Sequence, residues 1–461
     1  MLVSKPENRN QVFPAVVLSA VGLGLVCLII THSFAAYFAH ANPELALRLN
    51  PHEPTALVTL ARAHLGRVLR ETGGAGDEET TDVTDRLSGF ANSEAFAAAN
   101  DSTEDDAVNW TTNNESIRAN IRALAERAIA ADPLNSTALY LLGWSANADG
   151  ERQRATALMQ AAAKRSFRET PAVYDLLLRS FEAHQYGQVL DYADAILRTA
   201  SRMTHYVVPI VARVAEDGNA KDLLAEQLAR NPPWRGALLA RLPGAVKDAR
   251  TPLNILLALR DSGAPPSSDE LRGYIDVLIR NNLYELAYYT WLQFLSPDDL
   301  TRTGLLYNGS FDRPFSGLPF DWVIRRGAGV TIQVSSEAGL NQGQALNIEF
   351  GYGRIDFGGV SQMVLLAPGT YRFRGRFKGE IAGRRGLVWR IACAGKRDFL
   401  GESEMMVGSA PTWRTFSFSF EVPQEPSCRA QQVSLALDVR SASEKLVSGQ
   451  VWYGELAIER M

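Results

Sequence analysis

Cysteine and histidine are scarce in this chain, and their positions argue against metal chemistry. The 461 residues include three cysteines and six histidines. No histidine follows His205, and those of residues 43–297 are scattered without ligand spacing: His52, His64, His184 and His205. We therefore expect no cofactor and no histidine-based metal site, and the helical part of the chain contains no catalytic constellation.

A strong net charge is also absent, although the net charge of −4 hides an asymmetry. Residues 71–116 contain twelve Asp or Glu and one Arg, which is too polar a composition to build a core. Residues 305–461 have a net charge of +3, too small an excess to indicate nucleic-acid binding. A chain of this length is expected to form two or three domains.

One long apolar run lies near the N-terminus. Residues 12–38 carry no charge, and about 20 apolar residues span a bilayer core. The leader, residues 1–11, carries Lys5 and Arg9 against Glu7, a bias that keeps an N-terminus cytoplasmic. We expect a retained transmembrane anchor; the alternative is a signal peptide cleaved after Ala41. Either way the rest lies outside the cytoplasm, in the periplasm of a Gram-negative source, with the anchor in the inner membrane.

The three cysteines divide between the membrane segment and the last part of the chain. Cys27 lies in the apolar run, whereas Cys393 and Cys428 both lie near the C-terminus. An even pair in an exported domain predicts a disulfide. Closing a loop of about 35 residues would stabilise the fold by roughly 3 kcal/mol. The alternative is a pair of buried thiols.

Residues 43–297 are rich in Ala, Leu and Arg at helical spacing, which predicts an all-α region. The acidic stretch, residues 71–116, is predicted to be an insertion between two helices. The expected helices cover residues 54–70, 117–131, 138–144, a helix through 155–162, a pair within 171–198, and then 221–230, 252–261, 269–281 and 283–295.

Small residues recur in the middle of this region at the spacing expected where two helices pack closely. Leu142 and Gly143 are followed by Ala155 and Ala162. Gly143 and Ala155 let two helices of a pair approach closely, and Ala162 lets the next pair stack. This pattern resembles the tetratricopeptide repeat, whose period is about 34 residues. The resemblance implies a solenoid that binds proteins or peptides on its concave face; the alternative is a rigid spacer.

After residues 297–304 the periodicity changes to that of short strands. The expected strands cover residues 330–334, 345–350, 359–366, 369–378, 387–393, 413–422, 432–439 and 450–458. About eight strands separated by turns predict an all-β jelly-roll sandwich over residues 305–461.

Four segments of this region resemble galactose-binding-like carbohydrate-binding modules: Asn308-Gly309-Ser310-Phe311-Asp312, Pro319-Phe320-Asp321-Trp322, Pro368-Gly369-Thr370-Tyr371 and the closing strand at 449–458. The resemblance implies the fold more strongly than the ligand. Such modules often hold a structural calcium through an acidic residue of the opening motif and an Asp of the last strand. Asp312 matches the first and is the calcium candidate, but Gly454 stands at the second.

Strand alternation selects the candidate ligand-binding residues. In residues 371–377 the aromatic side chains face one side, and three arginines face the other: Arg372, Arg374 and Arg376. Arg390 points outward by the same parity. Alternation also places Tyr453 opposite Trp452, on a face where it is exposed. Because arginine pairs bidentately with carboxylates, we expect an acidic polysaccharide as ligand; the alternative is a solvated face that blunts the sheet edge.

The combination favours a non-enzymatic, membrane-anchored binding or scaffold protein that acts in the production or export of a cell-surface polysaccharide. Its expected partners are the membrane, proteins on the helical region and an acidic polysaccharide, with no nucleic acid. One alternative is a protein–protein scaffold of an envelope complex without a sugar ligand. A distant alternative is a glycoside hydrolase, which needs two carboxylates across a cleft. The available acids lack motif context: Asp312, Asp321, Glu349 and Asp356.

Overall fold

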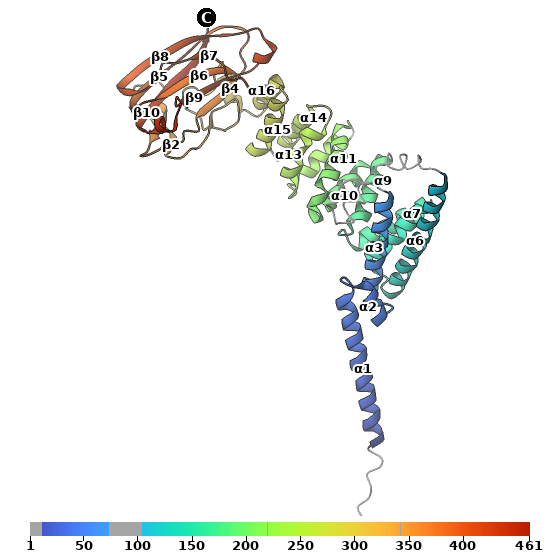
Figure 1. Ribbon diagram of the computed structural model, residues 1–461. Coiled ribbons are helices and arrows are strands. Elements are labelled where there is room, and N and C mark those ends of the chain that lie inside the picture. The colour runs from blue at the N-terminus through green and yellow to red at the C-terminus, as the bar shows by residue number, and fades with distance from the viewer. Residues whose placement is uncertain (1–11, 73–103, 219, 342) are drawn as a thin grey trace, which may run out of the picture. The chain divides into compact units, whose positions relative to one another are not determined.

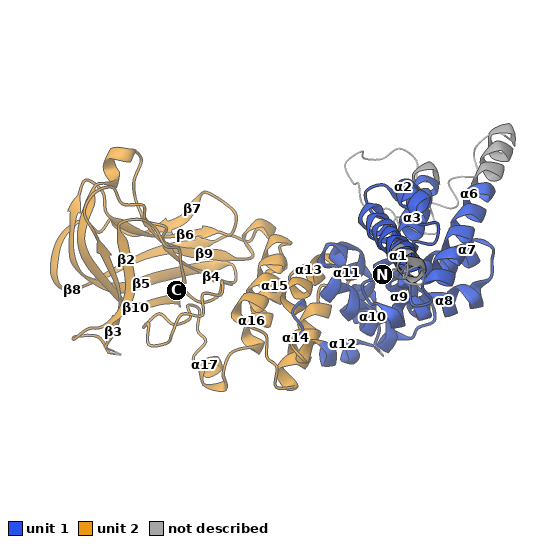
Figure 2. Ribbon diagram, turned by 90° about the horizontal axis from the view of Figure 1, so that it is seen from below, with its two compact units in different colours: residues 1–227, 232–234 blue, residues 228–231, 235–461 orange. Residues whose placement is uncertain are grey.

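The computed structural model describes residues 12–72, 104–218, 220–341 and 343–461. The chain forms two compact units that divide near residues 228–234 (Figure 2). The first unit is helical, and the second combines helices with a two-sheet antiparallel β-sandwich. The expected order, a helical N-terminal half followed by a β-sandwich, is confirmed.

The first helix, α1 (Val12–Phe38), is apolar and exposed (Figure 1). Residues 20–38 are long and apolar enough to cross a membrane. Leu18 and Leu23 expose more than seven-tenths of their surface, at 72% and 76%. A soluble core helix would bury such side chains, so α1 needs a covering that the described residues do not provide. The predicted leader, residues 1–11, lies outside the described residues.

The rest of the first unit is built from neighbouring helices that pack in pairs, α3 with α6, α7 with α8 and α9 with α10. The helices are α2 (Pro43–Leu49), α3 (Pro54–Thr72), α6 (Glu104–Ala131), α7 (Ser136–Ala148), α8 (Arg152–Arg165), α9 (Thr170–Glu182), α10 (Tyr186–Thr199), α11 (Thr204–Glu216) and α12 (Lys221–Ala229). The buried Glu169 accepts hydrogen bonds from Arg62 (2.6 Å) and Thr137 (2.7 Å), which ties α3 and α7 to the start of α9.

The residues that predicted close helix packing lie at the α7–α8 contact. A β-carbon on Gly143 would lie 3.2 Å from the Sδ atom of Met159, so glycine lets the two helices approach. Ala155 and Ala162 are fully buried, whereas Leu142 is only half-buried. These contacts describe close helix pairs; the tetratricopeptide repeat itself stays a prediction.

The helix bounds differ from the expected ones in two respects. Helix α6 begins at Glu104, so residues 104–116 of the acidic stretch are helical, and residues 73–103 lie outside the described residues. Helices α2, α11, α13 (Arg235–Ala245) and α17 (Pro297–Thr301) were not predicted. Of these, α11 and α13 each contain an internal proline, Pro209 or Pro243, which local propensity disfavours within a helix. Buried contacts along both helices outweigh that preference.

The second unit begins with five helices: α13 (Arg235–Ala245), α14 (Thr251–Asp261), α15 (Ser268–Arg280), α16 (Tyr284–Gln293) and α17 (Pro297–Thr301). The buried guanidinium of Arg235 forms two hydrogen bonds of 2.9 Å with the carboxylate of Glu270 on α15. Glu270 also accepts from the backbone N–H of Ser267, which completes a capping box at the start of α15.

The strands of the sandwich form two five-stranded antiparallel sheets (Figure 1). They are β1 (Val323–Ile324), β2 (Val330–Ser336), β3 (Gln344–Phe350), β4 (Val360–Val364), β5 (Gly369–Gly383), β6 (Leu387–Cys393), β7 (Phe399–Glu402), β8 (Gly408–Val422), β9 (Gln431–Leu437) and β10 (Val447–Arg460). Sheet A has the order β1-β4-β9-β6-β7, and sheet B has the order β2-β3-β10-β5-β8. All eight expected strands are present; β1 and β7 are additional and short.

Between the sheets lies an aromatic core centred on Trp389 of sheet A. Its ring contacts Trp322 (5.8 Å between centroids), Phe373 (5.5 Å) and Tyr453 (5.6 Å). All four side chains are at most 2% exposed. The inward side chains of both sheets therefore meet in one dry layer, the ordinary way in which a sandwich is stabilised.

A second aromatic cluster joins α16 to the sandwich. Trp291 of α16 is 1% exposed and packs against Tyr307 (5.0 Å) and Phe320 (5.9 Å). Gln362 of β4 bonds both the N–H and the C=O of Tyr307. The secondary structure changes where the sequence predicted, after residue 301, but the compact unit extends back to α13 because these contacts cross that point.

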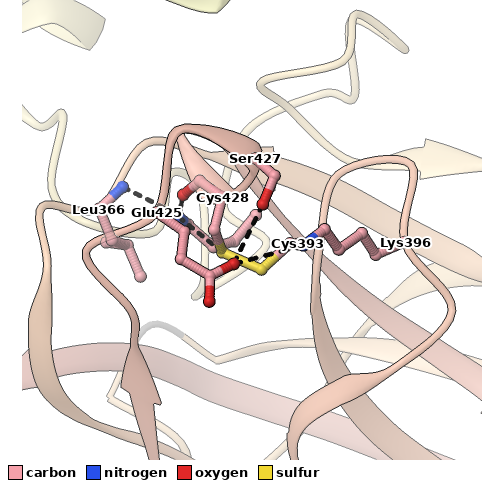
Figure 3. The surroundings of a disulfide bond; sticks show 7 residues. Leu366, Cys393, Lys396, Glu425, Ser427 and Cys428 are labelled. Atoms are coloured by element: carbon pink, nitrogen blue, oxygen red, sulfur yellow. Dashed lines mark hydrogen bonds and ion pairs between the residues drawn. A yellow bond between two sulfur atoms is a disulfide. The ribbon is translucent and has the colours of Figure 1, made fainter.

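The predicted disulfide is present and joins Cys393, at the end of β6, to Cys428, with a Cα–Cα distance of 4.9 Å (Figure 3). Beside it, Glu425 receives hydrogen bonds from Ser427 (3.1 Å) and Lys396 (3.4 Å). The amide of Gln431 donates to the carbonyl of Cys428 at 2.7 Å. The bridge therefore pins the loop between β8 and β9 to sheet A.

Candidate functional site

The arginine row lies on β5, between β10 and the edge strand β8 of sheet B, and its side chains point away from the core. Tyr371 and Phe373 are buried, whereas Arg372 and Arg374 are exposed and Arg376 is half-exposed. Antiparallel pairing places hydroxyl residues of β8 directly opposite the row: Ser419, Ser417 and Thr415. The predicted alternation is thus present, and it gives the outer face of sheet B a strip of guanidinium and hydroxyl groups.

The three arginines differ in how strongly they are held. The guanidinium of Arg376 donates to the carbonyl of Gly339 (2.8 Å), pairs with Glu455 and lies over the Trp413 ring. Arg374 pairs with Glu459 at 2.7 Å, and both side chains are nearly half-exposed. No hydrogen bond or ion pair holds the side chain of Arg372 within the part of the chain that the structure describes. Arg372 and Arg374 are the pair that an incoming anion can reach.

Arg390 does not join this row, because β6 belongs to sheet A. Its guanidinium bonds Asp438 (2.5 Å) and Glu402 (3.2 Å) and lies over the ring of Phe399. Arg390 points outward, as the parity predicted, because its neighbours Trp389 and Ile391 are buried, but it does so from sheet A. Parity along a strand shows whether a side chain points outward, but not which of the two outer faces it reaches.

Tyr453 is buried in the core at 2% exposure, so its expected role on the surface is wrong. Burial raises the pKa of its hydroxyl well above the ordinary value. The cause of the error is a β-bulge in β10: Glu455 has a φ of 54°, and the pairing with β5 shifts between Gly454 and Ala457. Before the bulge odd-numbered residues face the core, and after it even-numbered ones do.

The bulge turns Trp452 outward, beside a second indole that the sequence reasoning did not select. Lys378 of β5 lies 5.2 Å from the Trp452 ring and 5.4 Å from the Trp413 ring. The indole N–H of Trp413 donates to the carbonyl of Ala338 at 2.9 Å. The alternation that points Phe416 inward also points Trp413 outward, so this residue was detectable from sequence.

Asp312 and Asp356 each have a separate side-chain partner, whereas the side chain of Glu349 has none among the described residues. Asp312 bonds Arg302 (3.4 Å), and Asp356 bonds Lys445 (3.1 Å). Across the described ranges, no group of three or more His, Cys, Asp or Glu side chains converges to hold a metal ion. Glu349 is exposed on β3, where it pairs with Gln450 of β10.

Among the described residues of the sandwich, Asp321 is the one deeply buried carboxylate, at 1% exposure. Burial raises its pKa, and hydrogen bonds from the backbone N–H groups of Ser316 (2.7 Å) and Trp322 (2.7 Å) oppose that rise. The hydroxyl of Ser316 adds a further bond of 2.9 Å. The carboxylate therefore fastens the loop before β1, and its oxygens are occupied by that loop.

A scan against protein-family models finds no match, and neither does a search of the curated proteins. Several solved carbohydrate-binding modules are similar to the β-sandwich. TmCBM61 in complex with β-1,4-galactotriose is 18% identical, covers 34% of this chain and 99% of its own, and has a TM-score of 0.24. The second family 16 carbohydrate-binding module is 14% identical over 34% of this chain and 100% of its own, with a TM-score of 0.22.

A xylan-binding domain of family CBM22 from Paenibacillus barcinonensis is 15% identical, covers 30% of this chain and 85% of its own, and has a TM-score of 0.20. Identities and TM-scores this low carry no argument about ligand or activity.

Proposed function

We propose that this chain is a membrane-anchored extracytoplasmic protein whose β-sandwich binds an acidic polysaccharide through the outer face of sheet B. The observation that carries the proposal is the state of two adjacent arginines on β5. Arg372 has no partner among the described residues, and the partner of Arg374, Glu459, is itself exposed. Both guanidiniums can therefore turn to a ligand carboxylate without uncovering a buried charge.

Exchanging the ion pair of Arg374 for hydrogen bonds to a ligand carboxylate is energetically favourable. An exposed ion pair such as that between Arg374 and Glu459 contributes about 0–1 kcal/mol to stability. A hydrogen bond to a charged group contributes about 1.5–3 kcal/mol, and arginine can form two to one carboxylate. The hydroxyls of Ser417 and Ser419 on β8 provide neutral partners beside the row for sugar hydroxyls. The face thus suits a chain of sugars that carries regularly spaced carboxylates.

The remaining parts of the proposal concern placement and partners. The exposed apolar helix α1 supports an anchor, and the disulfide supports a location outside the cytoplasm. The paired helices of the first unit would form a tetratricopeptide-like surface for protein partners. A protein of this organisation would connect a cell-surface polysaccharide to the proteins that produce or export it, without catalysing a reaction.

The test compares two matched double variants of the full chain in detergent. Arg372→Gln with Arg374→Gln removes the row, and Arg326→Gln with Arg384→Gln removes the same charge from loops at the edge of the sandwich. Binding of polygalacturonate and of neutral dextran is measured by titration calorimetry. At about 1.5–3 kcal/mol per lost charged hydrogen bond, the first variant should bind polygalacturonate at least tenfold more weakly.

The control variant should bind polygalacturonate like the wild type, and dextran should bind more weakly than polygalacturonate. Because the substituted side chains are exposed, neither variant should change the melting temperature. Equal affinity for both polymers in wild type and row variant would reject the arginine row as the site. Absence of polygalacturonate binding by the wild type would reject an acidic sugar ligand and favour a protein–protein scaffold.

A further inference from the structure

The positive charge of the sandwich is concentrated in four loop segments, which we call the basic end: residues 325–328, 351–358, 383–386 and 440–447. Together they contain seven Lys or Arg and two Asp or Glu, a net charge of +5. Residues 305–461 as a whole have a net charge of only +3. Outside the basic end, acidic residues of this region therefore outnumber basic ones.

Backbone hydrogen bonds hold these four segments together although they are far apart in sequence. The N–H of Asp356 donates to the carbonyl of Ala328 at 2.9 Å, and the N–H of Ile355 donates to the carbonyl of Lys445 at 2.9 Å. Val447 pairs with Gly383 at the adjoining ends of β10 and β5. The charges thus share one end of the sandwich, on a framework of strand ends rather than on a free tail.

The arginines of the basic end are of two kinds. The guanidinium of Arg385 pairs with Asp438 and Glu444 and belongs to the framework. Five others are exposed, and no described residue forms a hydrogen bond or ion pair with their side chains: Arg325, Arg326, Arg354, Arg384 and Arg440. Uncompensated guanidiniums held within one set of joined loops attract an anion, because no internal partner competes for them.

Apolar side chains stand among these arginines. Tyr352 lies between two glycines and is fully exposed at 101%, and Leu446 is 59% exposed. Leu446 forms an isolated bridge with Arg354, so the aliphatic and cationic side chains come from paired positions. Val407 is 40% exposed and lies against the backbone at Gly386. A surface that only forms ion pairs in water does not need apolar side chains. Transfer of each of these side chains out of water would be favourable.

The combination matches a lipid surface better than a sugar polymer. Arginine pairs with headgroup phosphates, tyrosine prefers the level of the headgroups, and an exposed leucine gains from the acyl boundary. A polysaccharide offers anions and ring faces but nothing apolar enough for Leu446 and Val407. We propose that the basic end docks onto an anionic phospholipid surface, with Arg326, Arg354 and Arg384 on phosphates and Tyr352 and Leu446 in the interface.

The experiment uses the full chain held by α1 in nanodiscs of neutral phosphatidylcholine, so that α1 is already covered. These are mixed with sucrose-loaded vesicles and sedimented. The chain should cosediment with vesicles of phosphatidylcholine and phosphatidylglycerol at about three to one, but not with phosphatidylcholine alone, and salt should weaken the binding. Empty nanodiscs are the blank.

Two variants separate the contribution of charge to vesicle binding from that of apolar contact. Each arginine near an anionic membrane is worth about fivefold in affinity, so Arg326→Gln with Arg384→Gln should weaken vesicle binding about thirtyfold. Leu446→Ser should weaken vesicle binding severalfold at unchanged charge, which an electrostatic contact alone would not show. The matched control, Arg372→Gln with Arg374→Gln, should bind vesicles like the wild type.

Equal cosedimentation with neutral and anionic vesicles, or equal loss in both double variants, would overturn the proposal. It would also be overturned if Arg326→Gln with Arg384→Gln left vesicle binding intact and abolished polygalacturonate binding, which would assign the basic end to the sugar. The proposal does not depend on the arginine row of sheet B, because its residues and its readout are different.

Discussion

Removing the guanidinium of Arg235 should lower the free energy of unfolding of the second unit far more than removing the guanidinium of a surface arginine. Its side chain is 7% exposed, and that of Glu270 is 14% exposed. Besides the two bonds to Glu270, the guanidinium donates to the carbonyls of Leu228 (3.4 Å), Ala264 (3.3 Å) and Pro265 (3.2 Å). Arg235→Met keeps most of the volume and removes every one of these donors.

The expected loss of unfolding free energy in Arg235→Met follows from the carboxylate that remains buried. Glu270 keeps its charge without a counter-ion, and breaking one side of a buried ion pair costs about 3–5 kcal/mol. Glu270→Gln retains an oxygen that can accept from the N–H of Ser267, so the capping box survives, but the Arg235 guanidinium is then buried without a counter-ion. In the double variant no buried charge is left unpaired. Its cost should therefore fall below the sum of the two single costs by about 1–3 kcal/mol.

The assay is urea unfolding of the full chain, followed by tryptophan fluorescence. Of the eight tryptophans, five lie in the second unit and report on it: Trp291, Trp322, Trp389, Trp413 and Trp452. As a control, Arg397→Met changes an exposed arginine of the turn between β6 and β7 and should shift stability by at most about 0.5 kcal/mol. A cost below about 1 kcal/mol for Arg235→Met, or additive costs in the double variant, would refute the reasoning.

Three further outcomes are expected. Cys393→Ser should destabilise the second unit by about 3 kcal/mol in urea unfolding, whereas Cys27→Ser should not, because only the former opens the covalent loop. Trp291→Ala should lower the free energy of unfolding of the second unit by about 3–5 kcal/mol, because it removes a buried ring. Tyr289→Ala changes a half-exposed ring on the same helix and should lower it by about 0.5 kcal/mol or less. Because burial raises the pKa of Asp321, its contribution to stability is complete below the unfolded-state pKa of about 3.9 and is lost as the pH rises through the folded-state pKa. Asp321→Asn should remove this pH dependence from unfolding curves measured across the acidic range; a pH profile unchanged from that of the wild type would contradict the assignment.

The features that sequence reasoning predicted correctly depend on neighbours along the chain. Alternation in residues 371–377 placed the side chains of Arg372 and Arg374 outward, and β5 has that alternation. The pairing of Cys393 with Cys428 needed only a count of cysteines beyond the apolar run. Eight strands and most helices followed from periods of two and 3.6 residues, which report the local backbone conformation.

The errors arise where one residue or one long-range contact changes the outcome. A single bulge at Glu455 reverses the parity of β10, which buries Tyr453 and turns Trp452 away from the core. Pro209 and Pro243 concealed two helices that are stabilised by packing. Period-two arithmetic assumes an unbroken ladder, and propensity ignores distant contacts, so neither can detect these cases.

By itself, the sequence determined the exposed apolar helix, the helical region, the strands and the disulfide, because each depends on local periodicity or composition. Only the tertiary structure decided that Arg390 lies on a different sheet from Arg372, since strands adjacent in sequence pair in different sheets. The tertiary structure alone also brings Arg326, Arg354 and Arg384 together at one end of the sandwich. Such groupings are made by hydrogen bonds between strands and loops remote in the chain, and no local pattern encodes which partners those bonds will find.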